Sequence, residues 1–246
     1  MKALPGLDQC LTFVNCQLQP GGKMSYSDKD RPRRAVTISR QTGCGARVVA
    51  AKLADHLQSH DRHSRAPWTV FDQNLIERVL EDHHLPKRIE EFMPEDRISE
   101  IADIMDGLFE LRPSSWTLVH HTSETILHLA ELGSVILIGR GANIVTSKFD
   151  HIVHVRLIAP LEQRIERIQQ TEKLSAKEAA AFIRKEDRGR HRYIKKYFEQ
   201  DINDPLLYHL VINTGLVSLD KAVRMIAEMV LNVPANSFST QGTRTS

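Results

Sequence analysis

The chain has 246 residues, enough for one large domain with a continuous core and too few for two domains of ordinary size. Its composition is ordinary for a soluble globular protein, with 41% hydrophobic and 26% charged residues, and 33 basic residues nearly balance 31 acidic ones. A net charge of +2 gives no reason to expect nucleic acid or a membrane surface as the main partner, so any basic site has to be local.

The cysteines indicate a reducing compartment. Cys10, Cys16 and Cys44 form no CxxC pair and no disulfide framework, so we expect a cytoplasmic protein. No apolar run approaches the roughly 20 residues that span a bilayer, and the N-terminus lacks the apolar core of a signal peptide. We therefore expect no membrane partner.

Three regions follow from the hydrophobic pattern. Residues 1–33 carry no clear period and are predicted to be a poorly ordered leader. Residues 234–246 are rich in Asn, Ser, Thr and Gly and are predicted to be a disordered tail. Residues 34–233 remain as one domain.

Within this domain, short β-rich runs alternate with helical patterns. The predicted strands are 35–39, 68–71, 134–138, 151–157 and 210–213. The predicted helices are about 47–58, one around 75–80, a stretch over 86–132 broken at Pro94 and Pro113, one that begins at Pro160, one from the capping box Ser175–Glu178 to about 200, and one capped by Ser218. The alternation predicts an α/β fold with a three-layer, doubly wound parallel sheet of about five strands.

The first predicted strand ends in a glycine-containing loop that runs directly into a helix. Two glycines permit a tight turn and the helix N-terminus adds partial positive charge, an arrangement that binds phosphate. The loop differs from the Walker A pattern G-x-x-x-x-G-K-[ST], because Arg40, Ala46 and Arg47 stand where Gly, Lys and Ser or Thr would be. A plain strand-to-helix turn is the alternative. The candidate phosphate- or ATP-binding residues are Arg40, Thr42, Gly43, Cys44, Gly45, Ala46 and Arg47.

An arginine follows the strand 134–138 at the position where parallel sheets bind ligands. Arg140 lies between two glycines, and its planar guanidinium suits bidentate phosphate binding. A surface arginine in a turn is the alternative.

The helix opened by Ser175 carries a dense basic cluster. Arg184, Asp187, Arg188 and His191 share one face at helical spacing. That face either closes over a polyphosphate, or is a solvated basic surface, or binds RNA.

Metal and hydrolase chemistry have little support. The 12 histidines include the pairs 60/63, 83/84 and 120/121, which lack a companion carboxylate or cysteine at reliable ligand spacing, so no metal site is predicted. No Gly-x-Ser-x-Gly elbow is present, which argues against a hydrolase triad.

In combination, the motifs resemble the cytidylate kinase-like family of bacterial proteins. The runs that carry the resemblance are TISRQTGCGARVVA, FDQNLIERV, ILIGRGANIV, HVRLIAPLEQRI, IRKEDRGRHRYIKKYF, DINDPLLYHLVINT and VSLDKAV, within residues 35–233. The family is similar to the nucleoside monophosphate kinases. The resemblance implies a P-loop fold of that kind, with a helical acceptor-binding insertion over 86–132 and an arginine-rich lid helix.

The resemblance also implies roles for individual residues. Gly43 and Gly45 would form the phosphate loop, Arg140 would bind the acceptor phosphate, and Asp72 would lie beside the acceptor. The implied catalytic residues of the lid are Arg184, Asp187, Arg188 and Arg190.

The implied activity is ATP-dependent transfer of a phosphoryl group to a nucleotide or another small phosphorylated acceptor, with ATP and Mg²⁺ as cofactors. Ala46 stands where cytidylate kinases carry lysine, no Ser or Thr stands at the magnesium position, and Gly141 replaces an acceptor-holding aspartate. Cytidylate as the acceptor therefore does not follow. A non-catalytic nucleotide-binding or regulatory protein on the same fold is the first alternative, and an RNA-binding module is the second.

Overall fold

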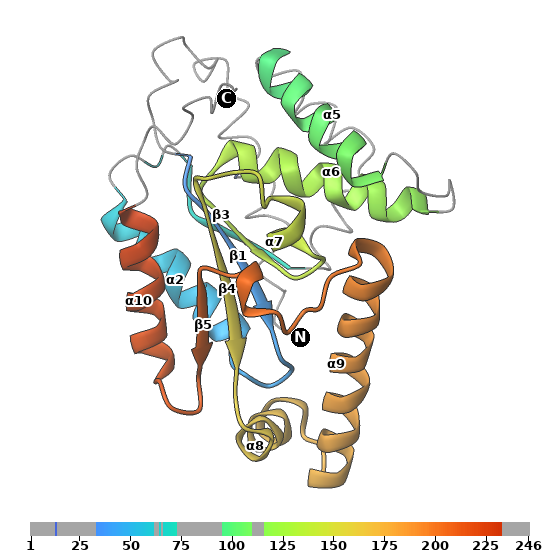
Figure 1. Ribbon diagram of the computed structural model, residues 1–246. Helices are drawn as coiled ribbons and strands as arrows, with labels where there is room; N and C mark the ends of the chain where they lie inside the picture. Colours follow the sequence, from blue (N-terminus) through green and yellow to red (C-terminus); the bar gives the residue numbers. More distant parts are fainter. Residues whose placement is uncertain are drawn as a thin grey trace, which may run out of the picture.

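A computed structural model describes residues 13, 33–61, 64, 66–72, 95–109 and 116–232. Its five strands form one sheet in the order β2-β3-β1-β4-β5, and every pair of neighbours is parallel (Figure 1). The strands are β1 Ala35–Arg40, β2 Thr69–Phe71, β3 Val135–Ile138, β4 Ile152–Ile158 and β5 Leu210–Asn213. The predicted five-stranded parallel sheet is confirmed, with strand ends shifted by at most one residue.

Helices cover both faces of the sheet. They are α2 Ala46–His60, α5 Glu95–Phe109, α6 Thr117–Leu132, α7 Ala142–Val145, α8 Leu161–Glu172, α9 Ala176–Phe198 and α10 Leu219–Leu231, with a 3-10 turn at Pro205–Leu207. The helix predicted around 75–80 lies outside the described residues. So do the predicted tail and the predicted leader, apart from Phe13 and Arg33.

Two hydrophobic cores make the fold three-layered, as predicted. One core joins α2 and α10 to one face of the sheet, where Val36 and Ile38 of β1 lie beside Val153 and Val155 of β4. The other core joins α5, α6 and α7 to the opposite face, and Phe13 packs edge-on against Phe71 there. None of the described helices is both long enough and apolar enough to cross a lipid bilayer.

Helices α8 and α9 form a hairpin with a small core of its own. Ile168 of α8 packs against Ala179 and Ile183 of α9, separately from the two main cores. The predicted capping box begins α9: the Ser175 hydroxyl accepts a hydrogen bond from the Glu178 N–H, and the Glu178 carboxylate accepts one from the Ser175 N–H. The hairpin follows β4 directly and α9 runs back beside the sheet (Figure 1). Only this end of the hairpin has a core of its own, because Ile194 and Phe198 in the C-terminal half of α9 belong to the core that α5, α6 and α7 share.

Candidate functional site

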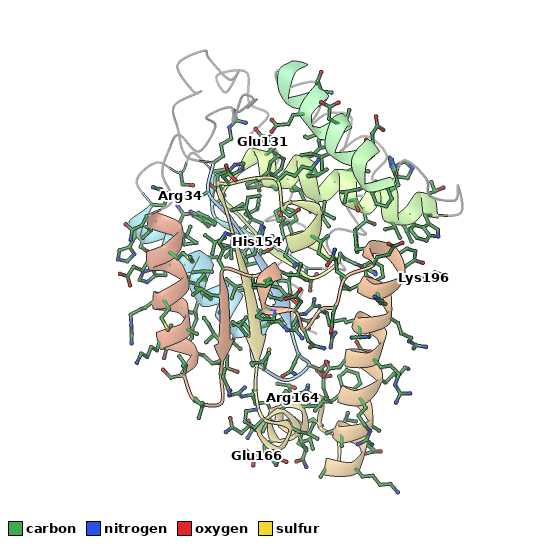
Figure 2. The ribbon with its side chains drawn as sticks, viewed as in Figure 1. Arg34, Glu131, His154, Arg164, Glu166 and Lys196 are labelled. Carbon is green, nitrogen blue, oxygen red and sulfur yellow. The ribbon has the colours of Figure 1, made fainter. Side chains whose placement is uncertain are left out.

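Because the sheet is parallel, the segments that follow its strands meet at one edge. The loop after β1 depends on glycine at this edge. Gly43 has φ +81°, and an added Cβ would lie 2.6 Å from the carbonyl oxygen of Arg164 on α8 (Figure 2). Gly45 caps α2 in the left-handed conformation, so the first amides of α2 open toward the edge. The tight glycine turn into a helix is therefore present, and phosphate binding by this loop stays a prediction.

One carboxylate joins this loop to the hairpin. Asp187 Oδ1 accepts hydrogen bonds from the Thr42 N–H and the Thr42 hydroxyl, both at 2.8 Å, and from Arg190 Nη2 at 3.0 Å. Asp187 Oδ2 pairs with Arg164 Nη1 at 2.6 Å, and Arg190 also donates to the Thr42 hydroxyl. Burial opposes the charged carboxylate, but the hydrogen bonds from Thr42, Arg190 and Arg164 outweigh it and lower the pKa of Asp187. Asp187 thus stays ionised and holds α9 against the loop.

Arg40 lies between the loop and the turn after β3. Its guanidinium lies so close to Gly139, which has φ +86°, that any side chain at position 139 would overlap it. Burial, followed by the positive charge of Arg190, lowers the pKa of Arg40 to about 10. Arg40 therefore remains charged at neutral pH in a region that already carries excess positive charge.

A cavity beside Arg40 has a volume of about 290 Å³. Its charged lining is five cations and one carboxylate: Arg40, Arg140, Lys185, Arg190, Arg192 and Glu186. The Arg140 guanidinium lies 5.4 Å from the centre of the Tyr193 ring, which also lines the cavity. The cavity therefore suits an anionic ligand with a group that packs against an aromatic ring.

Several predicted site residues lie elsewhere. Arg47 is 77% exposed and its Nη2 lies 3.5 Å from Asp72 Oδ2, so these two residues pair with each other and do not line the cavity. Cys44 is fully buried, and burial raises the pKa of its thiol. Ala46 is buried and supplies no charge. Cys44 and Ala46 can therefore reach a ligand only through the backbone.

The lid arginines divide between different faces of α9. Arg190 faces the loop, whereas Arg184 lines a separate cavity of about 270 Å³ with Lys185, Arg188 and Arg192. Arg188 lines both this outer cavity and a second cavity near the loop. The outer face is the surface that the RNA-binding alternative would use, and that alternative stays a prediction.

Residues that sequence reasoning missed complete the site. Arg167 of α8 donates to the Gly43 carbonyl at 3.3 Å and to the Thr214 carbonyl at 2.9 Å, tying the loop to the segment after β5. Arg164 and Arg167 are three residues apart in α8, a spacing that places both on one helix face. Arg156 is the one charge in an apolar strand run, and that anomaly is the signal that could have found it.

One group of side chains among the described residues has metal-ligand geometry. The ligand atoms of His120, His121 and Glu124 on α6 lie within 4.8 Å of one another. Glu124 is thus a companion carboxylate to this histidine pair, with Oε2 3.4 Å from His121 Nδ1. None of the three lines the cavities at the sheet edge.

Comparison with known proteins shows the family of this chain. The model of the cytidylate kinase-like family matches residues 35–216, from β1 through β5. The chain belongs to this family. A cytidylate kinase of Methanopyrus kandleri is 31% identical over 199 residues, which cover 78% of this chain and 90% of that kinase.

Two other similarities carry less weight than the family match. A uronate isomerase of Corynebacterium glutamicum is 30% identical over 111 residues, but these cover only 21% of that isomerase. The crystal structure of an uncharacterized protein from Eubacterium ventriosum superposes with a TM-score of 0.56 at 21% identity, and covers 80% of this chain and 98% of its own. The latter supports the fold alone.

Proposed function

We propose that this member of the cytidylate kinase-like family is an ATP-dependent phosphotransferase that acts on a nucleotide or another small phosphorylated acceptor. The observation that carries the proposal is the hydrogen-bonded contact between Thr42 of the loop and the Asp187–Arg190 pair of α9, beside a cavity lined by five cations. Family membership supports a nucleotide kinase-like function independently.

In this proposal the protein positions charges and does little covalent chemistry. The backbone amides around Gly43 and Gly45 hold a donor phosphate, and Arg140 holds the acceptor phosphate against Tyr193. Arg40 and Arg190 lie between these two places and neutralise the charge that develops on the transferred group. Closure of the α8–α9 hairpin excludes water and fixes the two phosphates in line.

The residues fit ATP better than they fit a protein-bound Mg²⁺. Arginines and the glycine loop suit polyphosphate, but the Thr42 hydroxyl is engaged with Asp187 and Arg190, and Asp72 pairs with Arg47. Mg²⁺ often keeps several waters and binds mainly through substrate phosphates. We therefore assign Mg²⁺ to the nucleotide and give it no ligand from the described residues.

The test is a transfer assay with radiolabelled ATP against nucleoside monophosphates and a panel of small phosphorylated compounds. We expect transfer to at least one acceptor, and a loss of roughly 10³-fold in kcat/KM for Arg190→Met. Arg224→Met, at an exposed position of α10, is the matched control and should retain activity. Absence of transfer to every acceptor would count against the proposal.

A specific observation favours the non-catalytic alternative: Ala46 is buried and Arg47 points away from the cavity, so no loop side chain replaces the missing lysine. Calorimetric titration with ATP, with and without Mg²⁺, separates the two proposals. Binding strengthened by Mg²⁺ supports the phosphotransferase. Tight binding that ignores Mg²⁺, together with no transfer, supports a nucleotide-binding regulatory protein.

A further inference from the structure

Arg156 is a buried arginine on β4 that has no acidic partner among the residues that the structure describes. Arg156 as a whole is 4% exposed to solvent. Nη1 donates to the Ser39 hydroxyl and Nη2 to Asn203 Oδ1, both at 2.8 Å, and the guanidinium lies 5.7 Å from the centre of the Tyr208 ring. These three partners are neutral, and no carboxylate of a described residue forms an ion pair with Arg156. Burying an uncompensated charge is costly, so a counter-charge is expected close by.

The space beside Arg156 is a second cavity, of about 220 Å³. Four guanidinium groups line it, those of Arg40, Arg156, Arg188 and Arg190. Its lining includes one carboxylate, Asp187, which already accepts hydrogen bonds from Thr42, Arg164 and Arg190. Within the described part of the chain, the buried Nε of Arg190 also has no hydrogen-bond partner. The cavity therefore holds more positive charge than its own acid can balance.

We propose that this cavity is an oxyanion site in which Arg156, presented by Ser39 and Asn203, binds a phosphate group. A phosphate oxyanion matches the planar guanidinium and accepts hydrogen bonds from several donors at once. The site adjoins the loop after β1, because Arg40 and Gln41 line it, and it shares Arg40 and Arg190 with the larger cavity. The phosphate is either free inorganic phosphate or the phosphate of a bound nucleotide, and binding of free phosphate does not depend on the proposed transferase activity.

The test measures the thermal unfolding midpoint in phosphate-free buffer, with added inorganic phosphate, and with added ATP. For the wild-type chain, we expect phosphate at about a hundredfold its dissociation constant to raise the midpoint by roughly 5–10 °C. Arg156→Met should abolish that rise, and Arg224→Met on α10 should keep it. A rise with ATP alone that still depends on Arg156 assigns the site to a nucleotide phosphate.

Asn203→Asp is a second variant that guards against misfolding of Arg156→Met. It places a carboxylate where the amide oxygen already lies 2.8 Å from Arg156 Nη2, and so supplies the missing anion within the chain. We expect a higher midpoint than wild type without phosphate, and a smaller response to phosphate. Wild-type responses to both phosphate and ATP in both variants would overturn the inference. Transfer activity is measured separately, so its absence would leave the phosphate result intact.

Discussion

His154 is buried in the middle of the sheet, where the fold disfavours its protonated form (Figure 2). Its Nδ1 lies 2.8 Å from the Thr37 hydroxyl of β1, and its backbone N–H donates to His209 Nδ1 at 2.9 Å. Burial, with smaller contributions from the nearby His209 and His151, lowers the pKa of His154 from 6.5 to about 3. Between about pH 6.5 and pH 3, the His154 ring is therefore protonated in the unfolded chain but not in the folded chain.

The direction and size of the effect follow from linkage. Below pH 6.5 the unfolded chain binds a proton at His154 and the folded chain does not, so stability falls with pH until the folded state also protonates near pH 3. One such group changes the free energy of unfolding by about 1.4 kcal/mol per pH unit inside this window. From pH 8 to pH 5, His154 should therefore lower the free energy of unfolding by about 2 kcal/mol.

The assay is urea unfolding of the wild-type chain and of His154→Asn across that pH range. Asparagine retains a polar atom for the Thr37 hydroxyl but does not titrate. Any loss of packing therefore lowers the free energy of unfolding by the same amount at every pH. We expect the pH dependence of the variant to be weaker by about 2 kcal/mol. His60→Asn on α2, where the ring is exposed, is the control and should follow the wild-type slope. Parallel curves for wild type and His154→Asn would refute the reasoning.

Three other substitutions test the site and its support. Gly139→Ala should displace Arg40, since the new Cβ overlaps its guanidinium, and lower ATP affinity roughly tenfold or more in calorimetry. Asp187→Asn should lower the free energy of unfolding by about 2 kcal/mol at pH 7, because Arg164 loses its acidic partner. The wild type should lose this advantage as the pH falls below about 4 and Asp187 becomes protonated. Urea unfolding of both chains at pH 7 and pH 3 measures the difference. Ser175→Ala removes the cap of α9 and should lower the free energy of unfolding by about 1 kcal/mol in the same assay. No measurable change would contradict the capping role.

Much of the fold was predictable because its signals are local. The apolar run of β3 is buried at all its positions, and the caps at Ser175 and Ser218 form the hydrogen bonds that their residue types predict. Pro160 lies one residue before α8 and is its N-cap, not its first residue. The strand order was not predicted, because pairing β1 between β3 and β4 depends on contacts over more than 90 residues of chain.

The candidate site was less predictable, since its decisive contacts join distant segments. Periodicity placed Arg184 and Asp187 on one face of α9, but Asp187 and Arg190 contact Thr42 of the loop whereas Arg184 lines the outer cavity. The buried face of α9 is apolar, with Ala179, Ile183 and Ile194 on it, and Asp187 on α9 also pairs with Arg164 of a different helix. Spacing within α9 does place Asp187 and Arg190 on the face of Ile183 and Ile194, but it does not show that Thr42 and Arg164 are their partners.

The distribution of charge bears on the choice between the two proposed functions. The chain is nearly neutral overall, yet four arginines line one cavity at the sheet edge and two of them, Arg40 and Arg190, also line the neighbouring one. Such clustering destabilises the fold through mutual repulsion. Burial, followed by the positive charge of Arg190, lowers the pKa of Arg40. A bound anion would relieve that repulsion. Arg40 and Arg190 reach these cavities from β1 and α9, outside the loop, and they supply positive charge that Ala46 does not, which favours a phosphotransferase over a protein that only binds nucleotide.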